Sequence, residues 1–155
     1  MTIIHSFLTG SFQFQNEEKL LNRQFAEWQP IIDWFCQRYE VDVAPSATLF
    51  GSPITPENRE KIRRHLLSHN FEAVHGFCFG VDAIKSIILM SAVADGRMTA
   101  SQAVKLSRLE LDYQTDFWGN VEWAHDLELH DTNARVAAAA MFIHFHNTNR
   151  STTEK

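Results

Sequence analysis

The sequence of 155 residues lacks an uninterrupted apolar run long enough to cross a membrane. The best candidate, residues 73–94, contains Asp82 and Lys85. A spanning helix needs about 20 predominantly apolar residues, so we expect this segment to be a buried helix. No membrane insertion is expected.

Cysteine is scarce. The two cysteines, Cys36 and Cys78, have no second cysteine or histidine nearby at zinc-finger spacing. This spacing argues against a disulfide framework and against a zinc finger. Two isolated thiols fit a reducing compartment, where we expect them to pack as small hydrophobic side chains.

Positive charge is also limited, with 14 Lys and Arg against 19 Asp and Glu and a net charge of −5. Nucleic-acid binding needs a basic surface, so nucleic acid is not an expected partner. Residues 1–18 contain no Lys or Arg. We therefore expect neither a signal peptide nor an Arg-rich transit peptide within them.

What the sequence does contain is helical periodicity. The length suits one domain, and 45% of the residues are hydrophobic, which is enough for a core. Little strand signal follows Val43, so the fold class is predicted to be an all-α helical bundle. We expect an extended arm over 1–15, an α-helical domain over 16–146 and a disordered tail over 147–155.

Three helix starts carry strong capping signals. Thr55 precedes a proline and a glutamate, Asn70 precedes an apolar repeat, and Thr99 stands three residues before Gln102 in a capping box. Before them, apolar spacing around Pro30 predicts either two helices or one kinked helix over 17–28 and 30–39.

A central apolar helix is predicted over about 71–94, ended by Asp95-Gly96. Its apolar residues recur at steps of three or four: Val74, Phe77, Val81, Ile84 and Ile88. The next helix starts at Thr99 and carries Leu106, Leu109, Tyr113 and Phe117 on one face, with Lys105, Arg108 and Asp112 on the other. Trp118-Gly119-Asn120 predicts its end, and a last long helix is predicted to about His146.

The last helix carries two apolar stripes when its residues are placed at about 100° each. The larger stripe is predicted to face the core: Trp123, Leu127, Ala134, Ala138, Met141 and Phe145. The lesser one contains Val121, Leu129, Val136 and Ile143, with His125 beside it. Asp131 and Arg135 are spaced to pair at i, i+4.

Two patterns in the sequence are compatible with an enzyme rather than a binding surface. Glu72-x-x-His75 and Glu122-x-x-His125, together with Glu27 and Glu110 on other helices, follow the order of ligands in ferritin-like di-iron bundles. Such ligands must meet in mid-bundle, whereas both motifs here begin their helices. We therefore expect no metal at these residues.

The second enzyme hypothesis is an HD-type hydrolase based on His125-Asp126. It needs a further histidine and a distant aspartate around a metal. His65 and His69 are spaced i, i+4 but lack the glutamate of a zinc-protease motif. No catalytic residue and no cofactor is expected.

The stretch "FWGNVEWAHDLELHD" instead suggests a protein-binding surface. Trp118, Gly119 and Trp123 are predicted to hold the start of the last helix, with the positive backbone angle at glycine that other residues resist. Glu122 and Asp126 then point outward on one wedge. Aromatic side chains are enriched at protein interfaces, so exposed aromatic and acidic groups side by side suggest a protein-binding surface.

The same residues carry a family resemblance. The strings "AVKLSRLELDYQTDFWGNVEWAHDLELHD" and "ARVAAAAMFIHF", with "EWQPIIDWFCQRYEVDV" upstream, resemble the ATP synthase mitochondrial F1 complex assembly factor 2 family. The resemblance covers about residues 13–146. Where that family commonly has two arginines around an alanine, this chain has Asn133-Ala134-Arg135, and a family glycine is Ala139 here.

The resemblance implies a chaperone rather than an enzyme. Family members have an N-terminal β-rich domain, so residues 1–15 would be a remnant of it, and a C-terminal helical domain that corresponds to this chain. They bind the unassembled F1 α subunit and promote assembly of the F1 complex. The implied location is the mitochondrial matrix, or the cytoplasm of a bacterium, and we expect a monomer. Partner-binding residues carried over or predicted are Glu122, Asp126, His125, Trp118, Trp123 and Arg135.

Overall fold

The computed structural model describes residues 14–43, 54–119 and 122–148, and at a few helix ends, including Trp118 and Glu122, only the backbone. All of its secondary structure in these ranges is helical, which confirms the all-α class. The expected arm and tail lie almost wholly outside the described residues. The helices are α1 (Phe14–Tyr39), α2 (Pro56–Leu67), α3 (Phe71–Ile84), α4 (Ile87–Ala94), α5 (Ala100–Ser107), α6 (Leu109–Trp118) and α7 (Glu122–Thr148).

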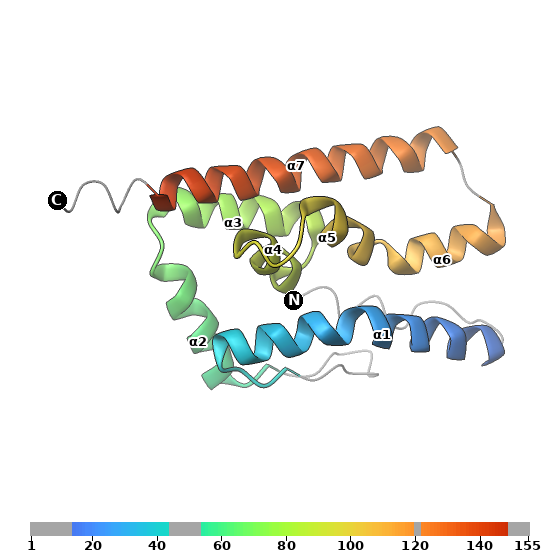
Figure 1. Cartoon of the computed structure of the whole chain (residues 1–155), viewed down its shortest axis with the longest axis horizontal. Coiled ribbons are helices and arrows are strands. Elements are labelled where there is room, and N and C mark those ends of the chain that lie inside the picture. The colour runs from blue at the N-terminus through green and yellow to red at the C-terminus, as the bar shows by residue number, and fades with distance from the viewer. Residues whose placement is uncertain (1–13, 44–53, 120–121, 149–155) are drawn as a thin grey trace.

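The helices form a bundle with α7 along one edge and α1 along the other (Figure 1). Helix α3 lies antiparallel to α7. The Asn70 side chain, just before α3, donates a hydrogen bond of 3.0 Å to the His146 carbonyl near the end of α7. Helices α4 and α5 fill the space between these edges. Among the described helices, none is both long and apolar enough to span a membrane. The core residues are Ala73, Phe77, Ile84, Leu89, Met90, Val93, Ala103, Val104, Val136, Ala139 and Ile143.

The three predicted helix starts are confirmed. The hydroxyls of Thr55 and Thr99 and the amide oxygen of Asn70 each accept the backbone N–H three residues on, at 3.2, 3.2 and 2.8 Å. The Gln102 side chain also accepts the Thr99 N–H at 2.9 Å, which completes the capping box. Each cap satisfies N–H groups that the first helical turn leaves unpaired.

The single central helix predicted over 71–94 is wrong, because two helices occupy this range. Lys85 ends α3 in the left-handed conformation with φ of 59°. The Ser86 hydroxyl then accepts the Leu89 N–H at 3.2 Å and caps α4. The segment still supplies the centre of the core, and Ile84 is buried as expected.

Pro30 does not divide the first helical segment. The sequence predicted either two helices, over 17–28 and 30–39, or one kinked helix. The structure has one helix, α1, with Pro30 inside it. Proline removes one backbone hydrogen bond. Two residues before Pro30, the Trp28 indole N–H donates a hydrogen bond to the Leu106 carbonyl at 3.1 Å, which joins α1 to α5.

The helix predicted to begin at Thr99 and continue through Phe117 is also two helices. Its break is at Arg108, where φ is −102° and ψ is 5°. The Arg108 N–H still bonds the Val104 and Lys105 carbonyls, both at 3.2 Å. Because the apolar spacing continues through the break, periodicity alone did not mark it.

The predicted core face of α7 is wrong, because the lesser stripe is the buried one. Gly76 and Gly80 of α3 let α7 approach: an added Cβ on Gly76 would lie 2.8 Å from Ile143 Cγ1, and one on Gly80 would lie 3.0 Å from Ala139 Cβ. Successive residues of a helix are about 100° apart, which places the stripe predicted as core roughly opposite this buried face. Trp123 on that stripe is 74% exposed.

Two neighbouring substitutions test which face of α7 is buried. Ile143→Ala should lower the free energy of unfolding by about 2–5 kcal/mol, because it empties part of a packed core. Met141→Ala, two residues earlier on the exposed face, should change the free energy of unfolding of the single chain, measured at high dilution, by less than about 0.5 kcal/mol. Denaturant unfolding measures both. Equal costs, or a larger cost at Met141, would contradict this orientation of α7.

Candidate partner-binding surface at the start of α7

The chain reverses between α6 and α7 around a glycine. Trp118 is the last residue of α6, and Gly119 follows with φ of 90° and ψ of 153°, its N–H donating to the Thr115 carbonyl at 2.9 Å. The positive φ predicted for Gly119 is confirmed. Glu122 begins α7. The side chains of Trp118 and Glu122 lie outside the described residues, so their roles in binding remain predictions.

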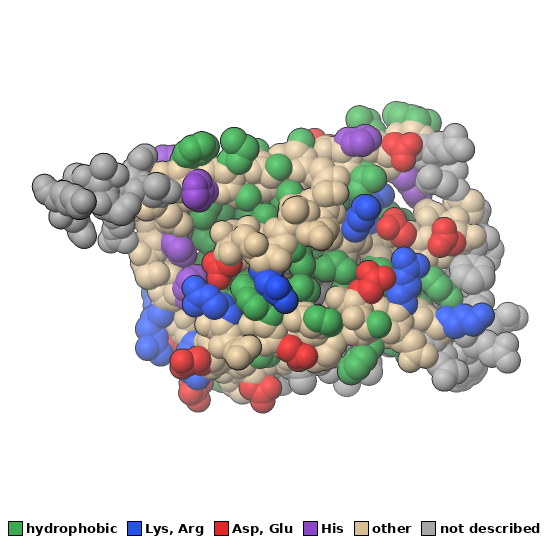
Figure 2. Space-filling view, in the orientation of Figure 1, with side chains coloured by type: hydrophobic (Ala, Val, Ile, Leu, Met, Phe, Trp, Pro, Cys, Tyr) green, Lys and Arg blue, Asp and Glu red, His purple; other side chains and the backbone are tan. Residues whose placement is uncertain are grey.

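Trp123 does not anchor the helix start as predicted. It is 74% exposed, and Leu127 one turn on is 62% exposed. Figure 2 shows hydrophobic side chains standing along the edge of the molecule where α7 runs. We call the exposed apolar residues of this helix face the outer stripe: Trp123, Leu127, Ala134, Ala138, Met141 and Phe145.

Asp126 lies beside this apolar surface with its carboxylate unengaged. Asp126 is exposed, and among the described residues it takes part in no ion pair, whereas Glu128 pairs with Arg108 and Asp131 with Arg135. On a helix, Asp126 borders the stripe that holds Trp123. A carboxylate is thus available to a basic group of a partner next to a large apolar contact.

Arg135 is placed away from Asp126. It pairs with Asp131 at 3.8 Å, which confirms the predicted i, i+4 contact, although both side chains are well exposed and such pairs contribute little. The Arg135 guanidinium also lies 5.1 Å from the centre of the Phe79 ring on α3. Arg135 therefore borders the outer stripe on the side of α3, and it does not join Asp126 in one cluster.

Arg108, which no sequence motif marked as important, holds the first turns of α7 in place. Its side chain is 10% exposed and pairs with Glu128 at 2.9 Å, and it donates to the His125 carbonyl at 3.3 Å. Arg108 was expected on the outer face of a continuous helix. The break between α5 and α6 turns it toward α7 instead, and His125 beside it is half-buried.

The candidate metal ligands have separate partners. Glu110 accepts from the Gln24 amide at 3.3 Å, and Glu27 pairs with Arg23 at 3.2 Å. His75 is exposed on α3. Across the ranges that the structure describes, no three His, Cys, Asp or Glu side chains group as a metal site.

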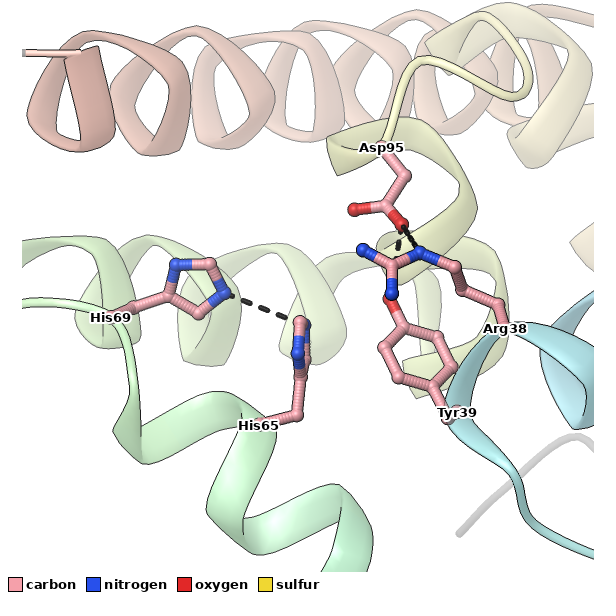
Figure 3. Close-up of polar contacts among 5 residues, drawn as sticks. All are labelled: Arg38, Tyr39, His65, His69 and Asp95. Carbon is pink, nitrogen blue, oxygen red and sulfur yellow. Dashed lines mark hydrogen bonds and ion pairs between the residues drawn. The ribbon is translucent and has the colours of Figure 1, made fainter.

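His65 and His69 form a polar contact at the end of α2 (Figure 3). Their Nε2 atoms lie 3.4 Å apart, and His69 Nδ1 lies 3.0 Å from the Asn147 amide oxygen on α7. An amide oxygen only accepts, so His69 carries its proton on Nδ1. The neutral His65 then donates from its Nε2 to His69.

Three residues of neighbouring helices continue this cluster. Asp95 after α4 accepts from Arg38 at 3.0 Å and from the Tyr39 hydroxyl at 3.4 Å, and the Tyr39 ring packs on His65. Burial, followed by the Asp95 charge, raises the pKa of Tyr39 to about 12. Burial, followed by His69, lowers the pKa of His65. The cluster therefore joins the ends of α1, α2 and α4.

The lowered pKa of His65 predicts a loss of stability in acid. The folded protein binds this proton less readily than the unfolded chain, whose histidine pKa is about 6.5. The stability that a neutral His65 contributes is fully present above the unfolded pKa. It is lost as the pH falls from there through the pKa of the folded protein. Thermal midpoints from pH 7.5 to pH 5 should drop less for His65→Gln than for the unchanged chain. The exposed His75→Gln should retain the full drop, and an unchanged slope in His65→Gln would contradict the assignment.

Comparison with known proteins gives one consistent relationship. No family model matches the sequence. The chain is 30% identical over 139 residues to the protein named atp12, mitochondrial, of Schizosaccharomyces pombe, a match that covers 88% of this chain and 48% of that protein. The chain thus spans about half the length of the curated relative.

Solved structures agree with the sequence match. The crystal structure of Atp12 from Paracoccus denitrificans superimposes with a TM-score of 0.75 at 26% identity, over 82% of this chain and 54% of that one. A single-substitution mutant of the same bacterial protein gives the same values. The family resemblance of the sequence is confirmed: this chain is a homologue of the Atp12 proteins and corresponds to about half of their length.

Proposed function

We propose that this chain is a molecular chaperone that binds the unassembled F1 ATPase α subunit and promotes assembly of the ATP synthase F1 complex. The homology to Atp12 proteins supports this role. So does the exposed surface at the start of α7, where Trp123 and Leu127 stand beside the unengaged Asp126. Large exposed apolar side chains next to charge are typical of protein-binding sites.

The proposed contact residues are Trp123 and Asp126 at the centre, with Glu122 and Trp118 at the helix start. His125 would mainly help to position the start of α7, because its backbone carbonyl accepts a hydrogen bond from Arg108. Arg135 would meet the partner farther along α7. We further propose that the chain works without catalysis or a cofactor, in the mitochondrial matrix or in the cytoplasm of a bacterium.

Trp123→Ala should separate binding from folding. Because the ring is largely exposed on the single chain, the free energy of unfolding measured at high dilution should change by less than about 0.5 kcal/mol. Affinity for the α subunit should fall by about tenfold or more, as for an interface tryptophan. The measurements are denaturant unfolding and the amount of soluble α subunit on co-expression. A strongly destabilised Trp123→Ala chain, or an intact rescue of solubility, would contradict this contact.

Glu122→Gln tests the glutamate that the family resemblance marks as functional. It should reduce the yield of soluble α subunit while leaving the thermal midpoint nearly unchanged. Glu72→Gln is a matched control, because Glu72 opens α3 in the same E-x-x-H spacing but lies at the other end of α7. The assignment fails if both substitutions have the same effect, or if Glu122→Gln unfolds the chain and so identifies a capping residue.

A further inference from the structure

The outer stripe of α7 has a symmetric spacing. Trp123 and Phe145 each lie 11 residues from Ala134, and Leu127 and Met141 each lie seven residues from it. At 1.5 Å per residue the stripe is about 33 Å long. Its four large side chains are all more than half exposed, which is an unusual amount of contiguous apolar surface for a monomer.

We propose that the outer stripe binds a second copy of this chain, with the two α7 helices antiparallel and the two-fold axis at Ala134. In this arrangement Trp123 of one copy meets Phe145 of the other, and Leu127 meets Met141. Each contact occurs twice, as a two-fold interface requires. The symmetric spacing of α7 therefore lets one helix face supply both halves of the interface.

The sizes of the side chains fit two crossing helices. Ala134 and Ala138, both exposed, allow the helices to approach closely at the crossing point, at about 8–10 Å between axes. Crossing helices diverge on either side of that point. The larger residues Trp123, Leu127 and Phe145 fill the widening space at the two ends.

The charges beside the stripe favour the antiparallel arrangement. Asp131 and Arg135 stand on either side of Ala134 in the sequence, on one border of the stripe. Antiparallel pairing places Asp131 of one copy near Arg135 of the other. A parallel two-fold pair would instead place Asp131 and Arg135 of the two copies on opposite sides of the interface, so this attraction between the copies would be lost.

With the outer stripe in solvent rather than in the core, the monomer expected from the sequence has a large apolar face to cover. Self-association would also cover Trp123 and Asp126. If the proposed binding of the α subunit is correct, that subunit must displace the second copy; only this consequence rests on the proposed function. The dimer itself is measured on the purified chain alone.

Molar mass in solution gives the first test. Light scattering or sedimentation at micromolar concentration should find twice the 17.8 kDa of one chain. Ala134→Arg places two arginines at the axis and should return the mass to 17.8 kDa with the helical spectrum and thermal midpoint of a folded chain. Ala26→Arg, on the exposed surface of α1, should leave the dimer intact. A monomer at every concentration, or a dimer unaffected by Ala134→Arg, would overturn the proposal.

Disulfide trapping tests the direction and the axis. With the exposed Cys78 replaced by serine, Ala134→Cys should oxidise to a covalent dimer, because the two cysteines face one another. His130→Cys should not, since its copies would lie about 12 Å apart along the axis, beyond the reach of a disulfide. Trapping at His130→Cys as efficiently as at Ala134→Cys would indicate parallel helices and refute the arrangement.

Discussion

The close approach of α7 to the glycines of α3 is the contact on which the rest of the structure depends. Gly76 and Gly80 leave room that Ile143 and Ala139 of α7 enter. A methyl group at either glycine would meet these residues or, at Gly80, the Met90 sulfur. This packing settles which face of α7 is buried, and it leaves the outer stripe in solvent.

Polar contacts then hold α7 at both ends. Near its start, Arg108 pairs with Glu128 and donates to the His125 carbonyl. Near its end, Asn70 donates to the His146 carbonyl and His69 contacts Asn147. Because both ends are fastened to other helices, α7 is presented as one continuous edge of the molecule (Figure 1). A fixed surface loses little conformational entropy on binding a partner.

This construction explains why a chain with an ordinary composition exposes so much apolar surface. The residues that would complete a larger core stand instead on the outer face of α7, beside the acidic side chains of its first turns. Such a surface is useful to a protein that covers the apolar surface of another chain. If the two proposals above hold, the α subunit and a second copy compete for this surface, and self-association covers it until the α subunit binds.

Much of the local structure could be predicted from the sequence. The caps at Thr55, Asn70 and Thr99 and the positive φ at Gly119 depend on interactions within a few residues, and the structure confirms them. The same is true of the Asp131–Arg135 pair. The candidate site was also located in the sequence, because Trp123 and Asp126 stand at the start of a helix that periodicity predicted.

Tertiary structure decided where helices break and which faces they bury. The left-handed Lys85 and the break at Arg108 interrupt apolar patterns that continue without a gap in the sequence. The periodicity of the sequence reveals both apolar stripes of α7. The larger stripe was predicted to face the core, and this prediction is wrong. Burial depends on the shape of the neighbouring helix. The two glycines on α3 accept Ile143 of the smaller stripe, together with Ala139, more closely than they could accept a tryptophan.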